Sequence, residues 1–322
     1  MKNTFDNNHN QMESYKVGDK ISFGRSFQQH EYVIKDIKYG GMGAILIANI
    51  ISGGDFVHRS KLAIKTIGSR FFSDNELQMF ERELNIWILL EHSRILPLRA
   101  IYRFSNGLYA LMPYCFDNLR DILIRERKLT LDHAIAMAIQ IIEALDYAKS
   151  LFKIVHLDIK PENILCNYDH TDKKPSYLLS DWGIASIQNS YYLSGNNKDL
   201  SNNILFKTYN NFGTLPYMSP ERLRGQTHSN IYSDVYSVGM ILFETIAGHL
   251  PFDYKSSNIA VQILKGDYFV FAQHFLNQYG NKRLNSFITN CISPDFNERF
   301  CDYQTIMREL KRVKNPIIGL FG

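Results

Sequence analysis

HLDIKPENIL at residues 156–165, followed by SDWG at 180–183, is the part of the sequence that decides the fold and the chemistry. The first segment places a carboxylate and an ammonium group close together, on Asp158 and Lys160. Asp158 can accept the proton of an attacking hydroxyl group, and Lys160 can neutralise a phosphoryl group as it moves. This pair of side chains predicts a phosphoryl-transfer site.

Two further side chains on the same segments are suited to a hard cation. Asn163 lies in the first segment and Asp181 in the second. Amide and carboxylate oxygens are ligands that Mg²⁺ accepts, and donors from two loops would let the cation bridge the phosphates of a nucleotide. We therefore expect ATP with Mg²⁺, or with Mn²⁺ in its place.

Both segments resemble motifs of the eukaryotic-type (Hanks-type) serine/threonine protein kinase family. The resemblance covers roughly residues 30–312. The sequence departs from the family patterns at Leu157, where the family has Arg, and at Trp182, where it has Phe. The positions that match the two catalytic patterns are His156, Asp158, Lys160, Asn163, Asp181 and Gly183.

The resemblance implies an α+β chain with the two-lobed protein-kinase fold. A small N-lobe with an antiparallel sheet and one helix would precede a larger, mainly helical C-lobe, with a cleft between them. The polar residues before position 30 predict a loose N-terminal extension. The expected ranges are 1–29 for this extension, 30–315 for the kinase domain (N-lobe 30–112, hinge 113–117, C-lobe 118–315) and 316–322 for a C-terminal tail.

Local patterns agree with this division. Three runs between Tyr32 and Ile67 alternate apolar and polar residues and predict antiparallel strands, and residues 74–90 have the spacing of an amphipathic helix. The further expected elements are a helix capped by Thr130, short strands around Val155, Ile164 and Leu178, and helices at 229–247 and 284–315.

The strand KLAIKTI resembles the family strand that carries a phosphate-binding lysine, here Lys65. Glu83 in the following helix is its expected ion-pair partner. A surface pair would contribute little to stability, but Lys65 lies in an apolar strand, where an unpaired charge is costly. The functional interpretation of the pair is therefore favoured.

The stretch KYGGMGAI resembles the family's glycine-rich loop, in the form found in bacterial members. Glycines let backbone N–H groups approach phosphates closely. Lys38 stands where the first glycine of the pattern is expected. Three glycines alone would more often form a simple hairpin turn, but their place one strand before Lys65 favours a phosphate cover. The glycines are Gly40, Gly41 and Gly43.

The resemblance also implies an adenine and ribose site. Ile45 and Ala63 would cover the base, Leu165 would lie beneath it, and Met112 would guard the back of the pocket. Pro113 and Cys115 would offer backbone groups of the hinge. The ribose is assigned to Asn118.

The segment GTLPYMSPE resembles the family's peptide-docking segment, and Thr214 with Lys160 favours serine or threonine over tyrosine as the acceptor. Glu221 is expected to pair with Arg299, because a buried carboxylate needs a partner. Asp234 is expected to brace the catalytic loop through backbone hydrogen bonds. Structural roles are thus assigned to His156, Glu221, Asp234 and Arg299.

Composition limits the class of protein. The 322 residues carry a formal net charge of +4, too small to indicate nucleic acid or an acidic membrane as a partner. The four cysteines form no C-x-x-C pair, which disfavours zinc. No membrane segment or signal peptide is expected. These observations predict a cytoplasmic protein whose partner is a protein substrate of unknown identity, with export into a host cell left open.

Three hypotheses remain on the sequence alone. The first is an active serine/threonine protein kinase. The second is a pseudokinase that binds nucleotide as a scaffold, motivated by Lys38, Leu157 and Trp182. The third is a small-molecule kinase, which GTLPYMSPE and Arg299 disfavour. Because Leu157 removes the Arg that clamps a phosphorylated loop, we expect activity to depend weakly on phosphorylation at Ser190, Ser194, Ser201 or Thr208.

Overall fold

The computed structural model describes most of the chain, which divides into two compact units. The first unit holds the described residues up to Glu91 together with Leu96–Cys115, and the second holds His92–Ile95 and the described residues from Phe116 onward. The described ranges are 15–25, 28–40, 43–52, 61–68, 74–168, 175–182, 215–225, 230–253 and 258–314.

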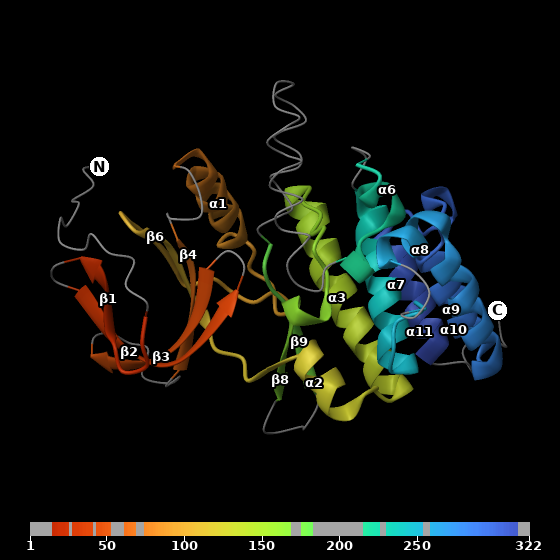
Figure 1. Cartoon of the computed structure of the whole chain (residues 1–322), viewed down its shortest axis with the longest axis horizontal. Coiled ribbons are helices and arrows are strands. Elements are labelled where there is room, and N and C mark those ends of the chain that lie inside the picture. The colour runs from red at the N-terminus through yellow and green to blue at the C-terminus, as the bar shows by residue number, and fades with distance from the viewer. Residues whose placement is uncertain are drawn as a thin grey trace. The chain divides into compact units, whose positions relative to one another are not determined.

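The first unit is a six-stranded antiparallel sheet with one helix (Figure 1). The strand order is β1-β2-β3-β4-β6-β5. The helix α1, Asp74–Trp87, packs against β6. The strands are β1 Lys20–Arg25, β2 Gln28–Gly40, β3 Gly43–Ser52, β4 Lys61–Gly68, β5 Ala100–Phe104 and β6 Gly107–Pro113.

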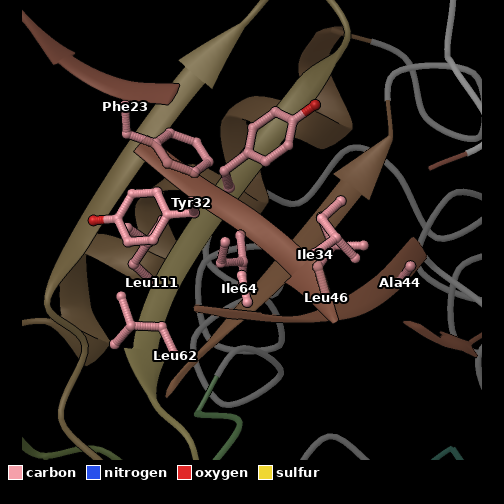
Figure 2. Close-up of a cluster of buried hydrophobic side chains, with 10 residues drawn as sticks. Phe23, Tyr32, Ile34, Ala44, Leu46, Leu62, Ile64 and Leu111 are labelled. Carbon is pink, nitrogen blue, oxygen red and sulfur yellow. The ribbon is translucent and has the colours of Figure 1, made fainter. Parts of the chain in front are cut away.

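One face of this sheet is a hydrophobic core (Figure 2). Alternate residues of a strand point to opposite faces, so Leu62 and Ile64 of β4 lie together on this side. Leu46 of β3 and Leu111 of β6 join them from the neighbouring strands. The alternate residues of β4, Ala63 and Lys65, are thereby placed on the other face of the sheet.

The structure corrects the expectation that residues 1–29 form a loose extension. Lys20–Arg25 is the strand β1, which pairs with β2 at the edge of the sheet. Phe23 is 1% exposed and stacks on Tyr102 with ring centroids 4.9 Å apart. The strand escapes sequence analysis because it is short and flanked by polar residues, while its stability comes from the distant residues of the core.

The second unit is mainly helical, with a small antiparallel sheet of order β7-β8-β9. The helix α7 packs against α3 and α10, and every residue from Ser233 to Ile246 is buried, which explains its apolar sequence (Figure 1). The elements are β7 Asp117–Asn118, α2 Leu119–Glu126, α3 Leu131–Phe152, β8 Ile164–Tyr168, β9 Pro175–Leu179, α6 Pro220–Leu223, α7 Ile231–Ala247, α8 Ile259–Lys265, α9 Asp267–Tyr279, α10 Lys282–Cys291 and α11 Tyr303–Lys314, with 3-10 turns at Pro161–Asn163, Leu215–Tyr217 and Phe296–Glu298.

The expected α+β architecture is confirmed, with three differences in detail. Val155 lies in an irregular segment rather than a strand, and the single helix expected at 284–315 is two helices, α10 and α11. The helices α2, α6, α8 and α9 were not expected. Within the described ranges, the helices are all too short or too polar to cross a lipid bilayer.

Candidate active site

Asp158 is the centre of a compact polar cluster in the second unit. Its side chain is 4% exposed, and its Oδ2 lies 2.9 Å from the Nζ of Lys160. The Nδ2 of Asn163 donates to the carbonyl oxygen of Asp158 at 2.8 Å and to its Oδ2 at 3.1 Å. The 3-10 turn Pro161–Asn163 reverses the chain after Lys160, so that the amide of Asn163 reaches back to Asp158.

The other oxygen of the Asp158 carboxylate, Oδ1, differs from Oδ2 in its hydrogen bonding. Asp158 Oδ1 is buried and has no hydrogen-bond partner among the described residues. A buried oxygen without a donor is costly, and such atoms in a folded protein call for an explanation by a bound group or a catalytic role. Oδ1 is therefore the atom of this cluster that can accept a proton from a ligand.

Lys160 remains charged in this setting. Burial would lower the pKa of its ammonium group, but the charge of Asp158 and the hydrogen bond to it outweigh burial, with a further contribution from Asp181. The pKa of Lys160 is consequently raised above its ordinary value. A fixed positive charge thus lies beside the candidate base.

The backbone before Asp158 is held by a buried carboxylate on α7. Asp234 accepts hydrogen bonds from the backbone N–H of His156 at 2.8 Å and of Leu157 at 2.7 Å, and from the hydroxyl of Tyr303 at 3.1 Å. Complete burial raises the pKa of Asp234, and the charge of His156 and these hydrogen bonds oppose that rise. The bracing contacts expected from the sequence are present in the structure.

Ser180, the residue before Asp181, is hydrogen-bonded to Asn163. The carbonyl oxygen of Asn163 accepts hydrogen bonds from the backbone N–H and the Oγ of Ser180, both at 2.9 Å. Asp181 follows with φ 63°, a left-handed conformation that is rare for a residue other than glycine. The two loops that carry the oxygen donors are thereby joined residue to residue.

Trp182 fits beside His156. The indole is 1% exposed, and its ring centroid lies 4.7 Å from that of the imidazole at an edge-on angle of 61°. The Nε2 of His156 lies 3.0 Å from the carbonyl oxygen of Ser180, and the Nε1 of Trp182 donates to the carbonyl oxygen of Leu179 at 3.3 Å. The larger ring is therefore buried with its polar atom satisfied.

The donor set of Asn163 and Asp181 fits a magnesium ion. The two hydrogen bonds of the Asn163 side chain use its amide nitrogen, and neither uses its oxygen. No group of three or more His, Cys, Asp or Glu side chains that could hold a metal occurs in the described part of the chain. Mg²⁺ is commonly held by one or two side-chain oxygens together with the phosphates of a substrate, so this set suits a cation that arrives with a nucleotide.

In the first unit, four of the expected ligand-binding residues share one face of the sheet. Lys65 pairs with Ile45 across β3 and β4, and Ala63 pairs with Met112 across β4 and β6. Since Ala63 and Lys65 are two residues apart, all four side chains lie on the face opposite the core of Figure 2. Glu83 is buried in α1 at 2% exposure.

The glycine-rich loop is described in part. Lys38 and Gly40 end β2, and Gly43 begins β3, with Gly40 paired to Gly43. A Cβ atom at Gly43 would lie 1.8 Å from the carbonyl oxygen of Thr66, so only glycine fits there. Gly41 lies outside the described residues.

Of the remaining residues expected to contact the nucleotide, two belong to the first unit and two to the second. Pro113 ends β6 and the half-buried Cys115 is the last residue of the first unit, while Leu165 pairs with Asn118 between β8 and β7. Asn118 is the N-cap of α2, and its Oδ1 accepts a hydrogen bond from the backbone N–H of Asp121 at 2.9 Å. Its side chain thus has a structural role, and a ribose contact stays a prediction.

Comparison with known proteins assigns the family. The family model of the protein kinase domain matches residues 43–310. The chain belongs to the protein kinase domain family.

The relatives of this kinase domain are longer proteins. It is 29% identical over 293 residues to a probable serine/threonine-protein kinase PknB of Lactococcus lactis, covering 90% of this chain and 43% of the relative. It is 29% identical over 241 residues to a probable serine/threonine-protein kinase MARK-A of Dictyostelium discoideum, covering 71% of this chain and 21% of the relative. A carbon catabolite-derepressing protein kinase of Candida glabrata is 28% identical over 225 residues, covering 70% of this chain and 33% of the relative. The chain thus spans less than half of the length of each of these relatives.

A solved structure agrees in fold. The crystal structure of Rad53 in complex with AMP-PNP matches with a TM-score of 0.64 and 22% identity, over 87% of this chain and 64% of that one. At this identity the likeness concerns the fold alone.

Glu221, in the segment expected to dock a peptide, forms a buried ion pair with Arg299. Arg299 donates from Nη1 to Glu221 Oε1 at 2.8 Å and from Nη2 to Oε2 at 3.1 Å. Its Nε and Nη1 also donate to the carbonyl oxygens of Ser293 and Tyr232. The pair expected from the sequence is therefore present, and Thr214 lies outside the described residues.

Sequence analysis missed a second ionic network beside the catalytic loop. It consists of Arg120, Glu162, Tyr217 and Glu244, which come from four different elements. The residue Glu162 lies within the motif that was recognised, and its proximity to Lys160 could have singled it out. No local pattern relates Arg120 to Glu244, which is more than a hundred residues away.

Proposed function

We propose that this chain is an ATP-dependent serine/threonine protein kinase that transfers the γ-phosphate of ATP to hydroxyl groups of a protein substrate. The observation that carries the proposal is the state of Asp158. One of its oxygens is bound by Lys160 and Asn163, and the other is buried without a donor among the described residues. A hydroxyl group of a substrate would supply that donor.

In this proposal the side chains of the chain position the reacting groups and neutralise the negative charge of the phosphates. Asp158 Oδ1 accepts the hydrogen of the attacking hydroxyl and takes its proton as the new P–O bond forms and the bond to ADP breaks. Lys160 stabilises the negative charge of the migrating phosphoryl group, and Lys65, whose expected partner is Glu83, binds the α- and β-phosphates. A magnesium ion held by Asn163 and Asp181 would neutralise charge on the phosphates when bound.

Two observations support a protein substrate with serine or threonine as the acceptor. The relatives named above carry the words serine/threonine-protein kinase or protein kinase in their names. The pair of Glu221 and Arg299 anchors the segment that resembles the family's peptide-docking region. Two of the residues that motivate the pseudokinase hypothesis, Leu157 and Trp182, are buried, and the contacts of Asp158 with Lys160 and Asn163 are present in the same structure.

The substrate class is tested with radiolabelled ATP and Mg²⁺. The purified chain is incubated alone, to measure autophosphorylation, and in separate reactions with a generic basic protein or with free sugars and amines. We expect label in protein, and phosphoamino-acid analysis should find it on serine and threonine. Label on tyrosine alone, or on small molecules alone, would contradict the proposal.

A further inference from the structure

Arg120 on α2 connects three groups from other parts of the second unit. Its Nε donates to Oε1 of Glu162 at 2.9 Å, and its Nη1 donates to Oε1 of Glu244 at 2.7 Å. Its Nη2 donates to the hydroxyl of Tyr217. All three nitrogens of the guanidinium group are therefore used, each on a different segment of the chain.

One side of this network is buried and held by hydrogen bonds to α7. Glu244 lies on the buried helix α7, and its Oε2 accepts a hydrogen bond of 2.6 Å from the Tyr217 hydroxyl. The carbonyl oxygen of Tyr217 is held in turn by Oγ of Ser237, also on α7, at 2.8 Å. Burial and the charge of Glu244 raise the pKa of Tyr217, so the hydroxyl stays protonated and keeps donating.

The guanidinium group of Arg120 stays charged. Burial would lower the pKa of its guanidinium group, but the hydrogen bonds and charges of Glu244, Tyr217 and Glu162 raise it above its ordinary value. Charge-assisted hydrogen bonds of this kind are about twice as strong as neutral ones. The cation is thus a permanent link between its partners.

The other side of the network is the catalytic loop. Glu162 lies in the turn Pro161–Asn163, between Lys160 and Asn163, whose side chains both bind Oδ2 of Asp158. The opposite end of the loop, at His156 and Leu157, is already held by Asp234. Asp234 and Glu244 both belong to α7, so the same helix reaches the loop directly at its start and through Arg120 at its end.

We propose that Arg120 is a positioning residue, which fixes the end of the catalytic loop by joining Glu162 to α7. It holds Lys160 and Asn163 against Asp158 without touching the reacting groups. This proposal rests on the proposed kinase activity for its effect on rate, but the link itself is a property of the fold. Small displacements of catalytic groups can lower a rate by about 100-fold. Loss of the link through Arg120 is therefore expected to lower kcat.

The test is a double-mutant cycle with Arg120→Met and Glu162→Ala. Glu162→Ala alone breaks the link and leaves Arg120 with Glu244, so no buried charge loses its last partner. We expect each single variant to lower kcat by about 10-fold or more with the KM for ATP within about twofold, and the double variant to lose no more than Arg120→Met alone. Arg125→Met, on the same helix at an arginine that is half-exposed and paired at the surface, is the matched control and should keep kcat.

Amide hydrogen exchange over residues 155–165 provides a readout that needs no activity. Faster exchange there in Glu162→Ala, with the parent rate in Arg125→Met and an unchanged melting temperature in both, is the expected result. If the parent has no kinase activity, the proposed function fails, and the exchange result alone decides whether the link exists. Independent effects of the two substitutions on kcat, or unchanged exchange in a folded Glu162→Ala variant, would overturn the proposal.

Discussion

Arg222 donates a hydrogen bond from Nη1 to the carbonyl oxygen of Leu157, the residue immediately before Asp158. Leu157 has φ 65°, and its N–H is bound by Asp234. Both polar groups of this left-handed residue are therefore held by side chains from elsewhere, while its own side chain is 1% exposed. The backbone next to the candidate base is positioned without the arginine that the family pattern has at this place.

Activity should depend weakly on phosphorylation of the segment that precedes the docking region. Leu157 carries no cation, so a phosphate on that segment finds no charge partner at this position. Treatment of the purified chain with a protein phosphatase should change kcat by no more than about twofold. The control is phosphatase inactivated by heat, and mass spectrometry should verify removal of phosphate. A loss of most of the activity would show that another cation takes over the role of the missing arginine.

The pair of Arg299 and Glu221 should stabilise the second unit strongly. Arg299→Met would leave the Glu221 carboxylate buried with its charge unpaired, and removal of one partner of a buried pair costs about 3–5 kcal/mol. The free energy of unfolding measured in urea at pH 7 is expected to fall by that amount. Arg312→Met, which removes an exposed pair with Glu309 on α11, is the matched control and should change the free energy by less than about 1 kcal/mol.

The same pair predicts how stability changes with pH. Burial would raise the pKa of Glu221, but the hydrogen bonds and charge of Arg299 outweigh it, so the pKa lies below its ordinary value. The pair therefore contributes fully above the ordinary pKa of a glutamate, about 4.3, and its contribution is lost as pH falls through the lower pKa of the folded state. The parent should lose more stability than Glu221→Gln when the pH is lowered from 6 to 3 in urea titrations. Parallel pH curves for the two proteins would contradict this assignment.

The strand β1 should be part of the stable fold of the first unit. Phe23→Ala would empty a site between Tyr102 and Tyr109, and loss of a buried aromatic ring costs about 3–5 kcal/mol. A drop of that size in the free energy of unfolding, with Val17→Ala at an exposed position as the control, is the expected result. An effect of Phe23→Ala as small as that of Val17→Ala would mean that the strand is not bound to the sheet in solution.

The sequence predicts the cluster around Asp158 because its members lie close together along the chain. The spacing of Asp158, Lys160 and Asn163 brings them together within a single turn, so a short pattern already contains the geometry. The β1 strand is different, since Phe23 is stabilised by core residues far away in sequence and its neighbours are polar. Arg120 illustrates the same limit, because its partners come from three distant segments and no local rule pairs them.

One expectation between these extremes concerned a single long-range contact. The pairing of Glu221 with Arg299 could be anticipated because a buried carboxylate needs a cation and the family pattern names one. Asn118 is the N-cap of α2, a role that suits an asparagine in front of a helix, and a ribose contact from the same side chain stays a prediction.

The most direct test of the central claim is γ-phosphate transfer by the parent and by Asp158→Asn, measured with Mg²⁺ under the same conditions. Asparagine keeps the shape of the side chain but cannot take the hydroxyl proton. We expect transfer by the parent, a loss of at least about 100-fold in the variant, and the same rise in melting temperature on adding ATP for both proteins. Equal transfer by the two proteins would show that Asp158 is not the base, and a parent that binds ATP but transfers no phosphate would contradict the assignment as an active kinase.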